Sequence, residues 1–199
     1  MRLVRKTLST PVGPMLTLAS ADALCALEFG AGHRMSRLDA RLLRFYPQFD
    51  IEDGTNPVIA AVSEWLDAYF AGTNANVDTL SLDARGTAFE RKVWRTLLTI
   101  PVGETRCYGQ VAAKAASTVL ASRAVGLANG ANPLAIIVPC HRVIGSDGSL
   151  TGYGGGLDRK TWLLEHEQRF WPTETSLSKV ARPTSGRATR ESRQPRLDF

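Results

Sequence analysis

The sequence predicts an α/β (α+β) fold, in which a small N-terminal antiparallel sheet with helices precedes a mainly helical C-terminal domain. Three observations lead to this prediction. Short apolar segments separated by turn residues fill positions 1–30, and helical apolar periodicity dominates afterwards. A last apolar segment, 135–138, runs into a proline, a cysteine and a histidine. We therefore expect domains at 1–82 and 83–171, followed by a disordered basic tail at 172–199.

Length and composition are typical of a globular protein. The chain has 199 residues, 44% of them hydrophobic and 22% charged, which is enough for a sizeable core. No apolar run is long enough to cross a bilayer, so we expect no contact with a membrane. The three cysteines, Cys25, Cys107 and Cys140, cannot all pair with one another. Free thiols favour a reducing compartment, and we expect a cytoplasmic protein.

The charge of the chain is compatible with an anionic partner but does not require one. The net charge is +5, and the tail from residue 172 onward contributes six Lys/Arg against three Asp/Glu, a net of +3. The remaining residues therefore carry about +2, which is 5 minus 3. Nucleic acid is one such anionic partner. With so little bulk charge, a face that binds DNA would have to come from the arrangement of the basic residues.

The N-terminal part is expected to consist of strands followed by helices. Turn residues separate three expected strands, at 3–8, 15–19 and 23–29. A helix is expected over 34–46. A second helix begins at Asn56-Pro57, an N-cap residue followed by proline at the first helical position, and Gly72 fits its end.

The C-terminal part is expected to be mainly helical. Thr87 and Glu90 fit a capping box at the start of a helix. Two short helices follow, at 110–116 and from about residue 120 or 122 to 129. Such a pair is compatible with a helix-turn-helix, although ordinary packing helices give the same pattern. A final helix is expected over 157–170.

Cys140 is the strongest candidate for chemistry. The apolar residues 135–138 predict a buried strand, which Pro139 ends because proline cannot donate a backbone hydrogen bond. A thiol at the end of a rigid element is well placed to act as a nucleophile. The neighbouring His141, backed by a carboxylate, can lower the pKa of the thiol. The alternative is an inert structural thiol, since free cysteines are often buried.

Neither a metal site nor a nucleoside triphosphate site is predicted. No set of four Cys/His residues has the spacing of zinc ligands. The glycine-rich segment 151–156 lacks the spacing and the lysine of a phosphate-binding P-loop. We expect no metal and no cofactor.

Five short motifs occur in order between about residue 86 and residue 167. The most specific is Pro-Cys-His-Arg-Val at 139–143. The others are Ser-Arg-Ala-Val-Gly at 122–126, Asn-Pro at 132–133, Gly-Tyr-Gly-Gly at 152–155 and Trp-Leu-Leu-Glu-His-Glu at 162–167. Together they resemble the O6-alkylguanine-DNA alkyltransferase family, the methylated-DNA–protein-cysteine methyltransferases. Residues 1–82 match only loosely, as the small sheet and helix domain of that family.

The resemblance implies a catalytic role for five residues. Cys140 would accept the alkyl group, His141 would take the thiol proton through a water, and Glu167 would orient and polarise His141. Asn132 would brace the active-site turn, and Tyr108 would donate a hydrogen bond to guanine N3. These roles suit the chemistry, because a thiolate must displace a guanine anion whose charge needs nearby donors.

The resemblance also implies a pocket for the base. The backbone carbonyls of Cys140 and Val143 would accept hydrogen bonds from the exocyclic amine of guanine. The N–H of Gly154 would reach the guanine oxygen, and Tyr153 would close the pocket. Since the reacting carbon lies inside the base stack, the nucleotide must be flipped out of the duplex.

The second short helix would bind the DNA. Arg123 would enter the duplex and occupy the space of the extruded nucleotide. Small residues on this helix, among them Ser122 and Gly126, would permit a close approach to the minor groove. One departure from the family concerns the preceding turn, 115–121, which is one residue longer than expected and lacks a Gly/Asn-Pro pair. Ser122 also stands where a small apolar residue is common.

The implied function is DNA repair by a protein that acts once. The partner would be double-stranded DNA carrying O6-alkylguanine, with O4-alkylthymine as a second substrate, and the protein is expected to be a monomer. The product is a thioether, which the same machinery cannot hydrolyse, so each molecule would be consumed. Two alternatives stay open: a DNA-binding module that recognises alkylated bases without reacting, and a Cys/His hydrolase that turns over.

Overall fold

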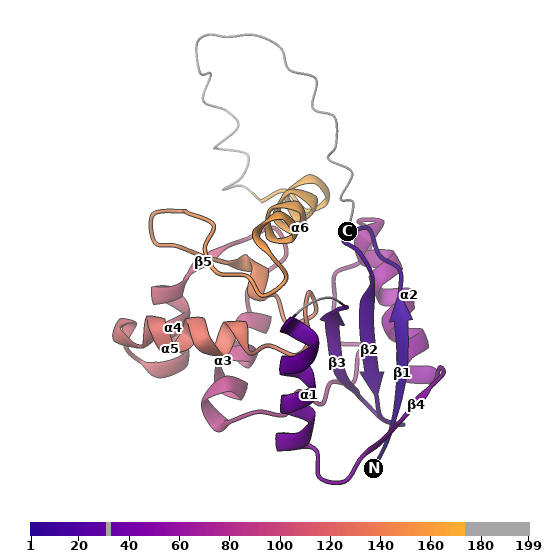
Figure 1. The fold of residues 1–199 in the computed structure, drawn as a ribbon. Helices are drawn as coiled ribbons and strands as arrows, with labels where there is room; N and C mark the ends of the chain where they lie inside the picture. Colours follow the sequence, from indigo (N-terminus) through magenta and orange to yellow (C-terminus); the bar gives the residue numbers. More distant parts are fainter. Residues whose placement is uncertain (31–32, 174–199) are drawn as a thin grey trace.

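A four-stranded sheet flanked by two helices forms the N-terminal half of the protein (Figure 1). The structure is a computed structural model and describes residues 1–30 and 33–173. The strands are β1 (Arg2–Leu8), β2 (Met15–Ala19), β3 (Leu24–Phe29) and β4 (Asp50–Asp53), in the order β3-β2-β1-β4. The first three form the predicted antiparallel meander.

The edge strand β4 is not predicted by the sequence pattern, and it makes the sheet mixed instead of antiparallel. It runs parallel to β1. Its sequence, Asp-Ile-Glu-Asp, lacks the apolar alternation of a half-buried strand. Charge pairing supports it instead, because Arg2 bonds to Glu52 and Arg5 to Asp53 across the two strands.

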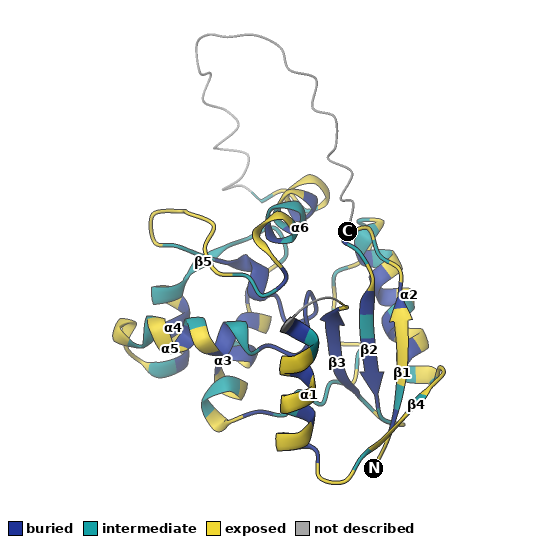
Figure 2. Cartoon of the chain, in the orientation of Figure 1, coloured by how far each residue is buried: buried dark blue, intermediate teal, exposed yellow. Residues whose placement is uncertain are grey.

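The predicted helices α1 (His33–Phe45) and α2 (Pro57–Phe70) pack on the sheet and belong to two separate apolar clusters. Asn56 caps α2 as expected, because its side chain accepts a hydrogen bond from the N–H of Ile59 at 2.9 Å. Buried residues fill β2, β3 and the inner sides of both helices (Figure 2). The cluster under α2 continues into the C-terminal half as far as Leu163. The division of the chain near residue 82 stays a prediction.

Helices dominate the C-terminal half, as predicted. They are α3 (Ala88–Leu98), α4 (Tyr108–Ala116), α5 (Ser122–Gly130) and α6 (Leu157–Phe170), with the 3-10 turns η1 (Val119–Ala121) and η2 (Cys140–Arg142). The axis bends by 116° between α4 and the helical stretch Val119–Gly130. A small parallel pair that was not predicted, β5 (Arg106–Cys107) with β6 (Val143–Ile144), ties the start of α4 to the segment after Cys140.

The predicted strand at 135–138 is wrong, because this segment forms a buried turn. Only Leu134 makes a β-bridge, to Leu27 of β3. The chain then turns, with a left-handed φ of 70° at Ile136 and a hydrogen bond from the N–H of Val138 to Leu134 O at 2.9 Å. The side chain of Asn132 satisfies backbone groups that a ladder would otherwise satisfy: it accepts from Leu134 N and donates to Val138 O. The four buried apolar residues at 135–138 are compatible with a strand and with a buried turn, so their pattern does not distinguish the two.

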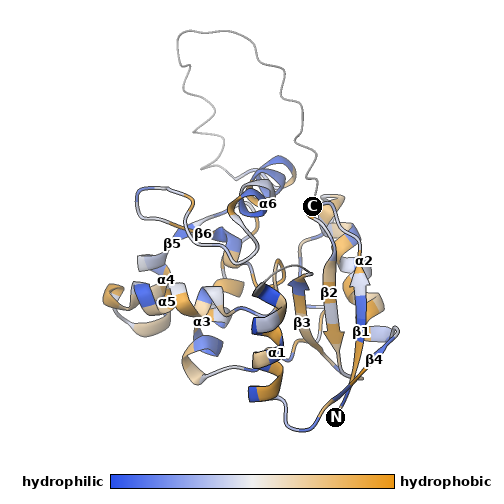
Figure 3. Cartoon of the chain, in the orientation of Figure 1, coloured by the Kyte–Doolittle hydropathy of each residue, from blue (hydrophilic) through white to orange (hydrophobic). Residues whose placement is uncertain are grey.

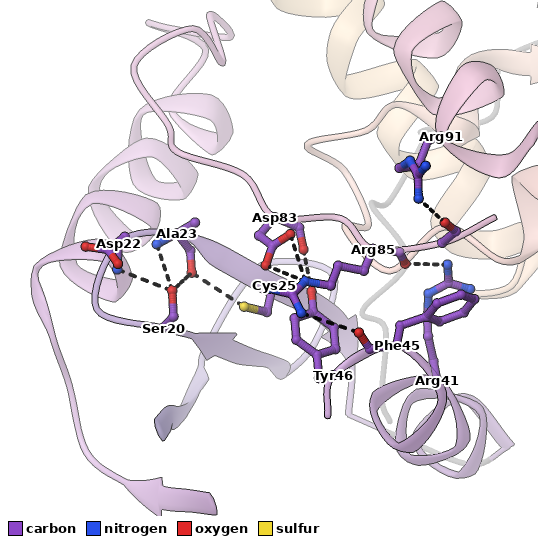
Figure 4. Close-up of polar contacts among 11 residues, drawn as sticks. Ser20, Asp22, Ala23, Cys25, Arg41, Phe45, Tyr46, Asp83, Arg85 and Arg91 are labelled. Carbon is purple, nitrogen blue, oxygen red and sulfur yellow. Dashed lines mark hydrogen bonds and ion pairs between the residues drawn. The ribbon is translucent and has the colours of Figure 1, made fainter. Parts of the chain in front are cut away.

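The segment that joins the two halves is fixed by side chains of α1 and α3 (Figure 4). Tyr46 donates a hydrogen bond to the carbonyl of Asp83, and Arg41 donates to the carbonyl of Arg85 at 2.7 Å. The guanidinium of Arg41 also lies 4.8 Å from the ring centre of Trp94 in α3. A Cβ atom at Gly86 would lie 2.5 Å from Arg41 Nη2 and 2.7 Å from the Trp94 ring, so only glycine fits there without rearrangement.

No single helix among residues 1–30 and 33–173 is long and apolar enough to cross a membrane. The bent pair of α4 and Val119–Gly130 passes the same test of length and composition. Its residues Val111, Ala115 and Val125 are buried in the common core. Residues 174–199, which make up nearly all of the predicted disordered tail, lie outside the described residues.

Substitution at the junction tests whether this close packing stabilises the fold. We expect Gly86→Ala to lower the free energy of unfolding by about 1–3 kcal/mol, because the added methyl group must displace Arg41 or Trp94. Gly130→Ala is the matched control, since a Cβ atom there meets nothing within 4 Å. Urea unfolding followed by circular dichroism measures both. Equal stability of the two variants would contradict the packing argument.

Candidate active site

The thiol of Cys140 is held at the first residue of η2, directly after the buried turn. The residue is 7% exposed. Its Sγ accepts a hydrogen bond from Asn132 Nδ2 at 3.2 Å, and its carbonyl accepts one from Asn129 Nδ2 at 3.2 Å. Burial raises the pKa of the Cys140 thiol above its ordinary value, while the hydrogen bond from Asn132 acts in the opposite direction. The expectation of an acidic resting thiol is therefore wrong: the thiol is neutral at pH 7.

His141, the residue after Cys140 in η2, forms a buried pair with Glu167 of α6. The Nε2 atom of His141 lies 2.8 Å from Glu167 Oε1, and both side chains are fully buried. Burial lowers the pKa of His141 below its ordinary value, although the Glu167 carboxylate opposes this shift. The imidazole is therefore neutral at pH 7, with its proton on Nε2 facing the carboxylate. The other nitrogen, Nδ1, makes no hydrogen bond to any described residue and has a free lone pair.

Glu167 has further partners that the sequence did not indicate. Arg142 donates to both carboxylate oxygens, from Nε at 2.9 Å to Oε2 and from Nη2 at 2.9 Å to Oε1. The hydroxyl of Tyr69 in α2 donates at 2.8 Å, and the N–H of Gly103 donates at 3.2 Å. Burial alone would raise the pKa of Glu167, but His141 and Arg142 hold it well below its ordinary value. Because His141 is neutral, Arg142 supplies the compensating positive charge.

Two tyrosines lie close enough to Cys140 to respond to its charge. Burial, together with a negative charge on Cys140, raises the pKa values of Tyr108 and Tyr153. The Tyr108 hydroxyl donates weakly, at 3.3 Å, to the carbonyls of Thr151 and Gly152. The buried Tyr153 hydroxyl has no partner among the described residues. Among the described residues, one hydroxyl is therefore weakly bound and the other unbound, and both can donate to a ligand.

A buried lysine fixes the backbone around this site. Lys160 of α6 is fully buried, and its Nζ donates to Val143 O at 2.6 Å and to Thr151 O at 2.7 Å. Burial lowers the pKa of Lys160 to about 8, while a negative charge on Cys140 acts in the opposite direction. The lysine thus joins β6, the glycine-rich segment and α6 at one point, next to the thiol.

The N-terminal half contributes a buried ion pair to the same region. Arg34 of α1 bonds to Glu28 of β3 and donates to the carbonyls of Gly130 at 3.0 Å and Asn132 at 3.2 Å. A Cβ atom at Gly154 would lie 2.2 Å from Arg34 Nη1. Arg34 therefore links α1 to the residue that bonds the Cys140 thiol and packs against the glycine-rich segment.

The predicted DNA-binding residues lie on α5, which borders the site. Ser122 and Gly126 face Tyr108 and its neighbourhood, since a Cβ atom at Gly126 would be 3.8 Å from Tyr108 Cε1. Ser122 Oγ donates to Val119 O. Arg123 is exposed, and no hydrogen bond or ion pair joins it to another described residue.

The structure brings most predicted site residues together and leaves Arg123 on the outer surface. Within residues 1–30 and 33–173, no group of three or more His, Cys, Asp or Glu residues could hold a metal ion. The missed residues are Tyr69, Lys160, Arg34 and Glu28. Tyr69 fits the apolar periodicity of α2, and the other three are charged residues without any local signal of burial. Arg142 lies inside the Pro-Cys-His-Arg-Val motif but had no assigned role.

Comparisons with known proteins agree with this geometry. Residues 3–84 match the family described as 6-O-methylguanine DNA methyltransferase, ribonuclease-like domain, and residues 88–169 match its DNA binding domain. A methylated-DNA–protein-cysteine methyltransferase of Mycobacterium tuberculosis is 45% identical over 174 residues, which is 86% of this chain and 96% of the relative. One of Salmonella typhimurium is 44% identical over 170 residues, 84% of this chain and 96% of that protein.

Solved structures give the same result. The O6-methylguanine methyltransferase of Mycobacterium tuberculosis has a TM-score of 0.71 at 42% identity and covers 88% of this chain and 99% of its own. A structure of the Mycobacterium tuberculosis protein OGT in complex with DNA has a TM-score of 0.69 at 40% identity, with 89% and 99% covered. Because the two family matches together span most of the sequence, the chain belongs to the 6-O-methylguanine DNA methyltransferase family.

Proposed function

We propose that this protein repairs DNA by transferring the alkyl group of O6-alkylguanine in duplex DNA to its own Cys140, once per molecule. The observation that carries the proposal is a buried pair whose first member directly follows Cys140 in the chain: His141, with a free Nδ1 lone pair, and Glu167, bonded to His141 Nε2 at 2.8 Å. The names of the relatives and the family match support the same activity.

The reaction begins with removal of the thiol proton. His141 accepts it at Nδ1 through a water, and the Glu167 carboxylate stabilises the resulting imidazolium. The Cys140 thiolate then attacks the alkyl carbon in line. The carbon–sulfur bond forms as the carbon–oxygen bond breaks, and the electron pair of the broken bond stays on the guanine. The product is a thioether on Cys140, so one protein molecule removes one alkyl group.

The pocket around the thiol stabilises the leaving guanine. Tyr108 donates a hydrogen bond to guanine N3, and the N–H of Gly154 reaches the guanine oxygen. The carbonyls of Cys140 and Val143 accept from the exocyclic amine, and Tyr153 closes the pocket. Lys160 supports these acceptors because it already holds the Val143 carbonyl in place.

DNA binding is assigned to α4 and α5, acting as a helix-turn-helix. Their 116° bend falls in the range of that motif. Arg123 enters the duplex while the alkylated nucleotide is flipped into the pocket, and Ser122 and Gly126 allow the helix to approach the minor groove. We further propose a monomer in the cytoplasm that needs no cofactor and also accepts O4-alkylthymine.

The first prediction concerns the acceptor. Incubation with a duplex that contains O6-methylguanine should add one methyl group per protein molecule, detected by intact mass. Cys140→Ser should add none, whereas Cys107→Ser, the matched control at a half-buried thiol, should react as the natural protein does. Binding without any added methyl would favour a non-reacting recognition module, and more than one product per molecule would favour a hydrolase.

The second prediction concerns Glu167. Glu167→Gln should slow alkyl transfer by about a hundredfold or more, because the imidazolium loses its stabilising charge. Glu165→Gln is the control, since this residue is exposed on the same helix. Single-turnover rates at saturating DNA measure the effect, with circular dichroism to confirm folding. A folded Glu167→Gln variant that reacts at the natural rate would remove Glu167 from the mechanism.

The third prediction concerns pH. Because burial lowers the pKa of His141 below 6.5, the transfer rate should stay level near neutral pH and fall only at more acidic pH, where the imidazole becomes protonated. The Glu167 carboxylate raises the pKa of His141, so Glu167→Gln should move this acidic fall to still lower pH. Single-turnover rates across a pH series test both statements. A shift towards higher pH would contradict the assignment of His141 as the base.

A further inference from the structure

The outer face of α5 carries two large apolar side chains that nothing in the described protein covers. Leu120 in η1 is 89% exposed and Leu127 in α5 is 72% exposed. The helical stretch Val119–Gly130 is continuous, so these residues and Arg123 are spaced i, i+3 and i+7 and share one face. At the left of Figures 2 and 3, the outer end of the α4–α5 unit shows both exposed and hydrophobic colours.

The turn that presents Leu120 is ordered by its own hydrogen bonds. Ser117 ends α4 in the left-handed conformation, with φ of 57°. Thr118 Oγ1 then accepts from the N–H of Leu120 at 3.3 Å, and Ser122 Oγ donates to Val119 O. These bonds order a turn that lacks the Gly/Asn-Pro pair usual in the family. The longer turn therefore holds an apolar side chain outward in a defined position, and the cost of ordering it is already met before any partner binds.

We propose that Leu120, Arg123 and Leu127 form one contact stripe for the minor groove of duplex DNA, with the two leucines packing on deoxyribose faces at either side of Arg123. This inference rests on the proposed function. It states that the two leucines supply a part of the DNA affinity that does not depend on salt concentration. Arg123, a cation without a partner among the described residues, lies between the two leucines and suits a polyanion.

Position relative to the thiol also favours DNA as the occupant. The same helix holds the Cys140 carbonyl through Asn129, at 3.2 Å, and its Gly126 lies against the ring of Tyr108. If the proposed function holds, a duplex whose flipped base reaches Cys140 therefore passes close to this helix. Proteins that bind the minor groove frequently place apolar side chains, leucine among them, against the bases of that groove.

The test compares Leu120→Ala and Leu127→Ala with Leu43→Ala, a control in α1 that is 77% exposed. Each substitution is made in the full chain together with Cys140→Ser, so that no alkyl transfer takes place during the binding measurement. Fluorescence anisotropy with a duplex containing O6-methylguanine is measured over a series of salt concentrations. Each stripe variant should bind roughly threefold to tenfold more weakly than the control, the size expected for losing part of a buried leucine surface. The salt slope should not change, because no counterions are involved.

Two further measurements keep the outcomes distinct. If the protein with Cys140 intact gains no methyl group from the same duplex, the proposed function fails. If it does gain one while the stripe variants bind as tightly as Leu43→Ala, the stripe proposal is overturned and the function stands. Sedimentation of each variant tests a second copy of the chain as the occupant: loss of a dimer without loss of DNA affinity also overturns the proposal. Circular dichroism confirms that each variant is folded.

Discussion

A single buried carboxylate holds the catalytic end of the protein together. Glu167 bonds at once to His141, to Arg142, to the hydroxyl of Tyr69 and to the N–H of Gly103. An unpaired charge at such a depth would cost several kcal/mol, so the fold depends on all these partners being present. The permanent charge of Arg142 balances the carboxylate, and this leaves His141 neutral and able to accept a proton. The bonds of Glu167 thus stabilise the fold and also keep His141 in the neutral form that the proposed reaction needs.

Two other buried cations fix the backbone around Cys140 in a similar way. Lys160 holds the carbonyls of Val143 and Thr151, and Arg34 holds those of Gly130 and Asn132. Each cation satisfies one carbonyl at the end of a short regular element, Val143 at the start of β6 or Gly130 at the end of α5, and one carbonyl in an irregular segment. In the proposed reaction, the thiol and the acceptor carbonyls would therefore be in place before the DNA binds, and binding would require little reorganisation. Arg34 belongs to α1, so the N-terminal half takes part in holding the backbone around Cys140.

The parts of the fold that follow from local sequence were predictable. Periodic helices and the cap at Asn56 depend on near neighbours, and they match the structure closely. The strands β4, β5 and β6 were missed because segments of two to four residues gain their stability from distant partners. The apolar segment 135–138 was misread for a related reason: its conformation depends on the Asn132 side chain and not on its own residues.

The candidate site divides in the same way. Cys140, His141 and Glu167 could be named because they stand in specific motifs. Tyr69, Lys160 and Arg34 could not, because burial of a polar side chain becomes visible only when the surrounding elements are assembled. The acidic thiol expected from the neighbours of Cys140 was wrong because burial outweighs the hydrogen bond from Asn132. Proximity of a base in the sequence does not determine the protonation state; the local exclusion of water does.

The neutral thiol has a consequence for a protein that acts only once. In the proposed reaction, each premature alkylation of Cys140 would consume a molecule. A buried, protonated thiol reacts slowly with small electrophiles, because the thiolate is the nucleophile. In that reaction, proton transfer to His141 would be productive only when an alkyl carbon is held in line with the sulfur and donors such as Tyr108 face the leaving base. Under the proposed mechanism, selectivity would therefore come from the geometry of the bound nucleotide, since a buried thiol without that geometry stays protonated.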